Sequence, residues 1–298
     1  MRINTIKAVS GLICLALALF LSSCHADSDK ASCESQMLAQ SKQCEDYERN
    51  ASAASYITIR GKQFGIETTH INLESMELTS EEIIPLRDMV DLEFLGLGRN
   101  QISDVTSLSG LTNLEVLWMN NNRISDITPL ENLANLKNLS LSGNQISDIT
   151  SLSGLTNLEV FWMTDNQISD ITSLSGLTNL EILWMNNNQI SDLSSLSGLT
   201  GLETLRLTHN QISDITSLSE LTNLETLWLD DNQISDIAPL ANLKNLRELS
   251  LRGNQISDLS PLSELTNLER LNLTGILFSQ VSDWSYVDHV PHVEGRPR

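Results

Sequence analysis

Residues 158–179 read LEVFWMTDNQISDITSLSGLTN, and the chain repeats this pattern at a constant spacing. Full copies follow one another over residues 92–267 without an insertion. They begin at Leu92, Leu114, Leu136, Leu158, Leu180, Leu202, Leu224 and Leu246. A fixed period of roughly 20 to 50 residues is typical of solenoids, in which each repeat packs only against its neighbours. The chain is therefore predicted to stack repeats rather than to fold around one irregular core.

Each copy combines two local patterns. The alternation Leu-x-Leu predicts a short strand whose leucines, such as Leu205 and Leu207, point to the same face. Two later leucines, such as Leu218 and Leu221, are spaced as a 3-10 turn requires. The predicted fold is a solenoid with a curved parallel β-sheet on its concave face. Short 3-10 turns and extended segments form its convex face.

The two ends of the repeat array are degenerate. Residues 56–91 are predicted to form a degenerate first repeat with a two-residue insertion. Its apolar positions are Ile71, Leu73, Leu78, Leu86 and Met89. A further copy begins at Leu268 and breaks at Ile276, where Asn is expected, so residues 268–298 are predicted as a degenerate last repeat and a tail. Terminal repeats must face water on one side, which explains the departure.

The register Leu-x-x-Leu-x-Leu-x-x-Asn-x-Ile-x-Asp, sustained over residues 92–267, closely resembles the leucine-rich repeats of internalins and phosphatase regulators. The resemblance implies a leucine-rich-repeat solenoid and, as in internalins, a helical N-terminal cap. Internalins follow their repeats with an immunoglobulin-like module, whereas only a short tail follows Gly275, so we expect no such module here. Phosphatase regulators are cytosolic, and the N-terminus of this chain argues against that location.

Residues 1–23 read as an export signal. Arg2 and Lys7 precede an apolar run over residues 8–21 that is too short for a membrane span. The sequence Leu-Ser-Ser-Cys ending at Cys24 resembles a bacterial lipobox, which implies acylation of Cys24 and attachment to a membrane. The alternative is ordinary cleavage after Ala26 and secretion of a soluble protein.

The next residues refine the expected location and cap. Asp after the lipidated Cys resembles an inner-membrane retention signal, and His25 stands there instead, so we expect the outer membrane of a Gram-negative bacterium. Residues 24–55 are predicted as a tether and a helical cap. Cys33 and Cys44 would then be available for a disulfide in an oxidising compartment. One continuous helix would hold them about 16 Å apart, so the segment folds back as a hairpin or the thiols pair elsewhere.

Two polar columns recur once per repeat and are predicted to serve the scaffold. Asn100 and its equivalents in the later copies, up to Asn254, lie at the turn that leaves the strand. There an amide satisfies backbone groups of its own coil and of the next one. Asp104 and its equivalents up to Asp258 open the convex segment, where a carboxylate caps the following backbone donors.

Variable outward positions carry the functional prediction. The position between the two strand leucines holds four of the five tryptophans of the chain. Read along the repeats, this column is Gly96, Trp118, Ser140, Trp162, Trp184, Arg206, Trp228 and Ser250. Phe94, Val116, Val160 and Ile182 flank it on the same face. Four tryptophans exposed in one column would form a large apolar patch, which is typical of interaction sites. The alternative is lateral packing of the tryptophans that stiffens the sheet.

Charged side chains also lie on this face, and arginines gather toward its C-terminal end. One acidic column beside the strands is Glu93, Glu115, Glu159, Glu181, Glu203, Glu225 and Glu269. Solvation at the rim is the simpler interpretation of this column, and a site for a basic partner is the alternative. Near the C-terminal end lie Arg206, Arg247, Arg252 and Arg270. His209 and Asp230, at the edge of the face, are candidate ligand contacts together with the tryptophans and Arg206.

The chemistry of enzymes is missing from the sequence. It contains no phosphate loop, HExxH motif or nucleophile elbow. His289 and His292 form a lone His-x-x-His, and Asp165, Asp230 and Asp231 offer too few oxygens for calcium, so we expect neither metal nor cofactor. The net charge of −20 argues against nucleic acid.

The sequence thus predicts a non-enzymatic extracytoplasmic binding module. It would hold a protein or peptide ligand on Trp118, Trp162, Trp184 and Trp228. The alternative is binding of envelope carbohydrate through the same column, because Trp faces stack on sugar rings and Asn120, Asn121, Asn186 and Asn187 lie nearby.

Overall fold

The computed structural model describes residues 56–276, 281 and 283–296. The chain divides into two compact units, Met1–Glu67 and Thr68–Arg298. The predicted signal, lipidation site, tether and helical cap all lie outside the described residues. In the first unit, β1 (Tyr56–Ile59) and β2 (Lys62–Gly65) form an antiparallel hairpin. Its turn passes through Gly61 with φ of 76°, a conformation that glycine adopts without steric cost. This hairpin lies within the range 56–91 that the sequence assigned to the first repeat.

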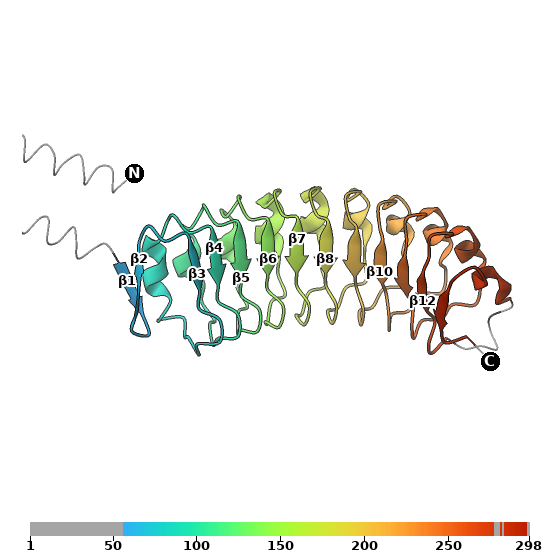
Figure 1. Cartoon of the computed structure of the whole chain (residues 1–298), viewed down its shortest axis with the longest axis horizontal. Coiled ribbons are helices and arrows are strands. Elements are labelled where there is room, and N and C mark those ends of the chain that lie inside the picture. The colour runs from blue at the N-terminus through green and yellow to red at the C-terminus, as the bar shows by residue number, and fades with distance from the viewer. Residues whose placement is uncertain (1–55, 277–280, 282, 297–298) are drawn as a thin grey trace, which may run out of the picture. The chain divides into compact units, whose positions relative to one another are not determined.

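The second unit is a solenoid, and its described residues form one parallel sheet of 11 strands arranged in chain order (Figure 1). The strands are β3 (His70–Asn72), β4 (Phe94–Gly96), β5 (Val116–Trp118), β6 (Asn138–Ser140), β7 (Val160–Trp162), β8 (Ile182–Trp184), β9 (Thr204–Arg206), β10 (Thr226–Trp228), β11 (Glu248–Ser250), β12 (Arg270–Asn272) and β13 (His292–Glu294). From β4 onward the strands start at equal intervals along the chain, whereas the interval from β3 to β4 is longer by two positions. The two-residue insertion read from the sequence lies in this longer interval.

Short 3-10 helices carry the chain across the side opposite the sheet. They are η1 (Ile84–Asp88), η2 (Thr106–Leu108), η3 (Thr128–Leu130), η4 (Thr150–Gly154), η5 (Thr172–Gly176), η6 (Ser194–Leu196), η7 (Thr216–Leu218), η8 (Ala238–Asn242), η9 (Ser260–Glu264) and η11 (Ser285–Val287). The predicted fold class, a leucine-rich-repeat solenoid with a parallel sheet and 3-10 turns, is confirmed. Within the described part of the chain, no helix has the length and hydropathy needed to span a membrane.

The aspartate column caps these helices, as predicted. The Asp148 carboxylate accepts a hydrogen bond from the backbone N–H of Thr150, at 2.9 Å, just where η4 begins. The same bond recurs in the other repeats, for example from Thr172 to Asp170 at 2.8 Å. These backbone bonds, with help from the threonine hydroxyls, lower the pKa of Asp148 and Asp170, because they stabilise the charged form.

The core is a stack of aliphatic side chains, one layer per coil, where a coil is one turn of the solenoid. Inward strand residues such as Leu183 and Leu205 have no exposed surface. Phe161 replaces leucine in one layer and is also fully buried. Alternation on each strand therefore sends the neighbouring residues to the outer surface of the sheet.

A ladder of asparagine side chains ties successive coils together. Asn122 is buried and donates from Nδ2 to the carbonyls of Met119, in its own coil, and Leu97, in the preceding coil. Its Oδ1 accepts from the backbone N–H of Ile102, also in the preceding coil, at 3.1 Å. The scaffold role is confirmed, but the predicted direction was wrong, because the amide serves the coil before it rather than the one after. Buried backbone groups need such partners.

Candidate functional site

Columns of outward side chains cover the outer surface of the sheet, which we call the sheet face. They arise because the strands pair without a shift, so that Trp162 lies beside Trp184 and Trp184 beside Arg206. The central column contains the four predicted tryptophans. It also contains Arg206, placed between Trp184 and Trp228 by the pairing of β9 with β8 and β10.

Four residues of the central column form a continuous stack, which we call the Trp–Arg array: Trp162, Trp184, Arg206 and Trp228. The rings of Trp162 and Trp184 lie 5.5 Å apart, centroid to centroid, at 37°. The Arg206 Cζ atom lies 4.3 Å from the ring centroid of Trp184 and 3.7 Å from that of Trp228. A guanidinium over an indole face is attracted by the ring quadrupole, so these contacts stabilise the stack.

Trp118 belongs to a separate aromatic cluster. Ser140, which is buried, separates it from Trp162 in the central column. Trp118 instead meets Phe94 edge to face, with centroids 5.1 Å apart at 82°. The Phe94 ring in turn stacks on His70, 6.0 Å away. The predicted tryptophan column is therefore divided into two aromatic clusters, and the one around Trp118 also includes His70, which the sequence pattern did not indicate.

The tryptophans face outward from the sheet but do not stand free in solvent. All four are partly buried, and their Nε1 atoms are buried without a hydrogen-bond partner among the described residues. Lateral packing against neighbours therefore accounts for part of their role, as the alternative interpretation held. Because each N–H is turned inward, the part of each ring that reaches solvent is carbon.

Arg206 is a cation without an ion pair among the described residues. Its Nε is buried and has no partner there, and its Nη atoms, which retain solvent exposure, make no hydrogen bond or salt bridge to any described residue. Burial lowers the pKa of Arg206, because desolvation penalises the charged form, while the negative charge of Glu248 acts in the opposite direction. The guanidinium stays charged at neutral pH.

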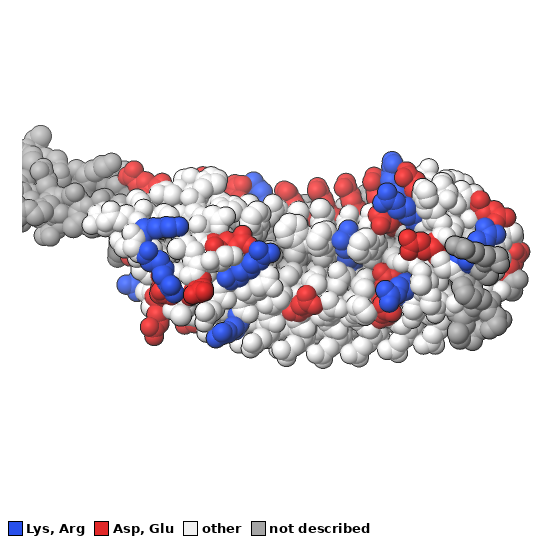
Figure 2. All heavy atoms as spheres, turned by 60° about the horizontal axis from the view of Figure 1, so that its bottom comes forward, with Lys and Arg blue, Asp and Glu red and all other residues white. Residues whose placement is uncertain are grey.

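The rim beside the strand starts is acidic. The predicted glutamate column is exposed, and Figure 2 shows an evenly spaced row of acidic side chains along the upper edge of the solenoid. Lys137 occupies one step of this column and pairs with Glu115 at 2.8 Å, a contact that raises the lysine pKa. Arg247 occupies another and lies 3.6 Å from Glu225 and 3.5 Å from Glu269. Basic side chains thus neutralise the rim locally at two steps.

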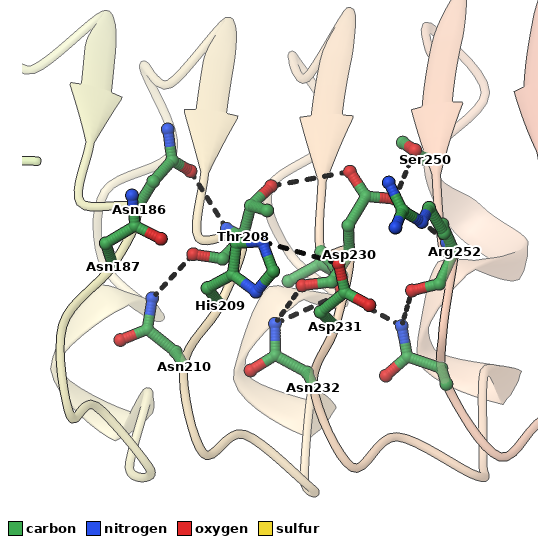
Figure 3. A network of polar contacts seen from close by, with 12 residues as sticks. Asn186, Asn187, Thr208, His209, Asn210, Asp230, Asp231, Asn232, Ser250 and Arg252 are labelled. Carbon is green, nitrogen blue, oxygen red and sulfur yellow. Dashed lines mark hydrogen bonds and ion pairs between the residues drawn. The ribbon is translucent and has the colours of Figure 1, made fainter. Parts of the chain in front are cut away.

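The opposite edge carries a polar network at the turns that follow the strands (Figure 3). Asp230 accepts hydrogen bonds from the Ser250 hydroxyl and from the backbone N–H of Arg252, the latter at 2.9 Å. His209, exposed and in the left-handed region at φ of 55°, lies 3.5 Å from the Asp231 carboxylate through Nε2. Asp230 therefore links coils in the free protein, and its predicted ligand contact stays a prediction, as does that of His209.

A depression of about 720 Å³ opens beyond Trp228. The residues that line it include Trp228, Glu248, Ser250, Arg270 and Glu294. The repeat pattern does not indicate this depression, because residues 268–298 were predicted as a degenerate repeat and a tail. Val293 lies one repeat length after the inward Leu271 and pairs with it in the structure, which was the available signal.

Metal and thiol chemistry receive no support from the described residues. Within them, no three His, Cys, Asp or Glu side chains are arranged to hold a metal ion. His289 contacts the carbonyl of Leu265 through Nε2 at 3.2 Å. Cys24, Cys33 and Cys44 lie outside the described residues, so lipidation and the disulfide stay predictions.

Comparison with known proteins identifies the repeats. The family model described as leucine-rich repeats (two copies) matches residues 90–132, 134–176, 157–198, 178–220, 200–242 and 244–286. None of the curated proteins matches the chain. Leucine-rich-repeat proteins of the internalin and receptor-ectodomain types generally bind proteins and are typically not enzymes.

Solved structures resemble the solenoid. Internalin C2 from Listeria monocytogenes is 39% identical, with 64% of this chain and 85% of that chain covered and a TM-score of 0.61. A leucine-rich-repeat protein of Leptospira interrogans is 27% identical, with coverages of 70% and 56% and a TM-score of 0.64. The Arabidopsis receptor kinase HAESA, solved with the peptide hormone IDA and a co-receptor, is 26% identical, with coverages of 70% and 38% and a TM-score of 0.63. With family matches over most of its repeats and a fold shared with internalins, the chain belongs to the leucine-rich-repeat family.

Proposed function

We propose that this protein is a non-enzymatic binding module that holds a protein or peptide ligand on its sheet face, across the Trp–Arg array. The family's general role in protein binding supports this class of ligand. The structure of HAESA with a peptide hormone is an example of a peptide complex formed by a similar solenoid. Trp118, Phe94 and the depression beyond Trp228 would extend the contact at either end.

The array itself is the observation that carries the proposal. Three indole rings and one guanidinium are held in a fixed stack on a rigid sheet, with carbon at the surface. Side chains that are already ordered lose little conformational freedom on binding. Central aromatic and arginine residues usually carry most of the binding energy of an interface. A ligand that covers the three indole rings would bury their carbon edges without leaving a new indole N–H unpaired.

Carbohydrate binding is the weaker candidate. Stacking on a sugar needs a free ring face, and Trp184 packs between Arg206, whose Cζ lies over its ring, and the tilted ring of Trp162. Two of the four amides named for a glycan are also engaged. Asn186 accepts from the backbone N–H of Thr208 at 2.9 Å, and Asn187 donates to Asp165 at 2.7 Å. The contacts of the array therefore favour a protein ligand.

We further propose an extracytoplasmic location with a lipid anchor at Cys24. The support is the basic start, the apolar run over residues 8–21 and the lipobox-like Leu21 to Cys24. His25 favours the outer membrane of a Gram-negative bacterium, and secretion in soluble form is the alternative. A binding module on a membrane surface needs no catalytic group.

The test selects peptides from a random library displayed on phage against the purified protein. Selected peptides should bind Trp162→Ala, Trp184→Ala and Trp228→Ala at least about 2 kcal/mol more weakly than the unmodified protein. Trp284→Ala is the matched control, because Trp284 lies outside the sheet face, and it should leave affinity unchanged. Peptides that bind all three array variants normally would place the binding face elsewhere and overturn the proposal.

A further inference from the structure

Arg206 differs from the other arginines of the sheet face in how it is held. Its guanidinium carbon lies over the indole rings of both neighbouring strands, 4.3 Å from the centroid of Trp184 and 3.7 Å from that of Trp228. The side chain is therefore ordered before any ligand arrives. By contrast, Arg252 and Arg270 are exposed.

The donors of Arg206 are unused within the described part of the chain. Guanidinium carries five N–H groups in a planar fork. Nε is buried without a partner, and the Nη groups make no bond to a described residue. A partly desolvated cation with unpaired donors carries an uncompensated desolvation cost. A hydrogen bond to such a group is stronger than one in water. An acceptor from outside would supply that bond.

The surroundings of Arg206 select the kind of acceptor. Its neighbours in the adjacent column are Ile182, Thr204 and Thr226, which carry no charge. Asp230 is engaged with the next coil, and Glu248 acts on Arg206 through space without forming an ion pair within the described residues. An incoming carboxylate would therefore meet one cation flanked by indole rings and uncharged side chains, with Glu248 as an acidic group that already acts on it through space.

We propose that Arg206 recognises the side-chain carboxylate of an Asp or Glu in the ligand. This inference rests on the proposed function and names its partner chemistry: an acidic residue flanked by apolar residues. The carboxylate would pair with the Nη groups, which suit bidentate contact. The flanking apolar side chains would cover the carbon edges of Trp184 and Trp228.

The net charge of −20 does not oppose this contact at short range. The exposed glutamates of the rim, such as Glu203, are screened over a Debye length of about 8 Å at physiological salt. Their field acts on the approach of the ligand rather than on the pair once formed. Association of an acidic peptide should consequently be faster at physiological salt than at a tenth of that concentration, the opposite of what a basic ligand would show.

The experiment repeats the peptide selection on the unmodified protein and on Arg206→Met. Methionine keeps an unbranched, polarisable side chain between the two indole rings but removes the charge and the donors. Peptides selected on the unmodified protein should be enriched in Asp or Glu beside apolar residues. Those selected on Arg206→Met should keep the apolar residues and lose the acidic one.

Single peptides then give the decisive measurement. Changing the enriched Asp to Asn, or Glu to Gln, should weaken binding to the unmodified protein about tenfold to a hundredfold. The same change should leave binding to Arg206→Met nearly unaffected. Arg206→Lys, which keeps the charge without the planar fork, should retain part of the discrimination.

The outcomes separate this inference from the proposed function. If no selected peptide depends on the tryptophans, the proposed function fails. If peptides depend on the tryptophans but lack an acidic residue, the role of Arg206 is refuted. It is also refuted if changing the acidic residue of the peptide weakens binding to Arg206→Met as much as it weakens binding to the unmodified protein. Circular dichroism and thermal unfolding confirm that each variant is folded, and Arg206→Lys supplies the comparison if Arg206→Met is not.

Discussion

The Cζ atom of Arg206 lies 3.7 Å from the ring centroid of Trp228 on the neighbouring strand. An arginine thus takes the place of a tryptophan in the column without interrupting the stack. The contact links β9 to β10 through side chains, in addition to the backbone pairing. Residues that touch in this way are energetically coupled, so changes within the array should not be additive.

Substitutions in the outward column should cost less stability than substitutions in the core. Leu183 is fully buried, so Leu183→Ala is expected to cost about 2–5 kcal/mol of unfolding free energy. Trp184 is only partly buried, and Trp184→Ala loses ring contacts with Trp162 and Arg206, so we expect a smaller loss of about 1–3 kcal/mol. Urea unfolding followed by circular dichroism measures both. Equal losses would mean that the array is chiefly structural.

The asparagine ladder offers a matched pair of amides. Asn188 is buried and donates to the carbonyls of Met163 and Met185, while its Oδ1 accepts from the N–H of Ile168 at 3.0 Å. Asn188→Ala leaves these groups unpaired in the interior and should cost about 2–4 kcal/mol. The measurement is the urea midpoint together with the m-value, because repeat arrays lose coils separately when their cooperativity breaks down.

Asn179 is the control for that substitution. It is exposed and donates to the carbonyl of Thr156 at 2.9 Å. Water replaces this bond, so Asn179→Ala should cost about 1 kcal/mol or less. If the two variants unfold at the same urea concentration, the buried amide adds nothing beyond a surface hydrogen bond.

Acid should weaken the solenoid through its helix caps. The pKa of Asp148, Asp170 and Asp258 is lowered in the folded state by hydrogen bonds from the backbone and then the side chain of the residue two positions later. Deprotonation therefore favours folding. This stabilisation is present above the unfolded pKa, about 4, and is lost as the pH falls through the folded pKa. Urea midpoints from pH 7 to pH 2 should follow this course.

Replacing these three aspartates with Asn keeps the acceptor oxygen and removes the titration. The triple variant should lose less stability between pH 5 and pH 2 than the unmodified protein. Glu93→Gln, Glu181→Gln and Glu203→Gln together remove the same number of charges from the exposed rim. If the rim variant also loses less stability between pH 5 and pH 2, the acid sensitivity comes from net charge and not from the caps.

Membrane attachment depends on one sulfur atom in the proposed scheme. Cys24→Ser removes the thiol that a lipobox-like sequence would acylate, so labelling with a palmitate analogue in a bacterial host should disappear. The chain should also leave the membrane fraction. Persistent labelling of the variant, or none in the unmodified protein, would favour ordinary cleavage after Ala26.

Much of the fold was predictable because each repeat obeys local rules. Leu205 and Leu207 alternate with Arg206, so the inward and outward faces follow from a period of two. The hairpin over residues 56–65 has no repeat pattern, and nothing in the periodicity indicates it. The strand at Val293 was missed because the tail lacks the leucine and asparagine that mark a repeat.

The candidate site was less predictable than the fold. The sequence places Trp184, Arg206 and Trp228 in one column, but the stacking of the guanidinium between the rings depends on side-chain rotamers that spacing does not determine. The same is true of Asp230, whose carboxylate turns toward Ser250 and Arg252 rather than toward solvent. Packing among neighbours, which differs at every step of the column, decides these details.

The direction of the asparagine ladder gives the solenoid a polarity. Each amide completes the backbone of the coil before it, so the N–H of Ile234 is satisfied by Asn254 of the following coil, at 3.0 Å. At Ile256 the equivalent residue of the next coil is Ile276, which has no acceptor in its side chain. Loss of a coil from the C-terminal side therefore opens the isoleucine N–H of the coil before it to exchange with water, whereas loss from the N-terminal side frees an asparagine side chain and none of these isoleucine N–H groups. Fraying, and the exchange of amide hydrogens that reports it, should therefore advance from the C-terminal end.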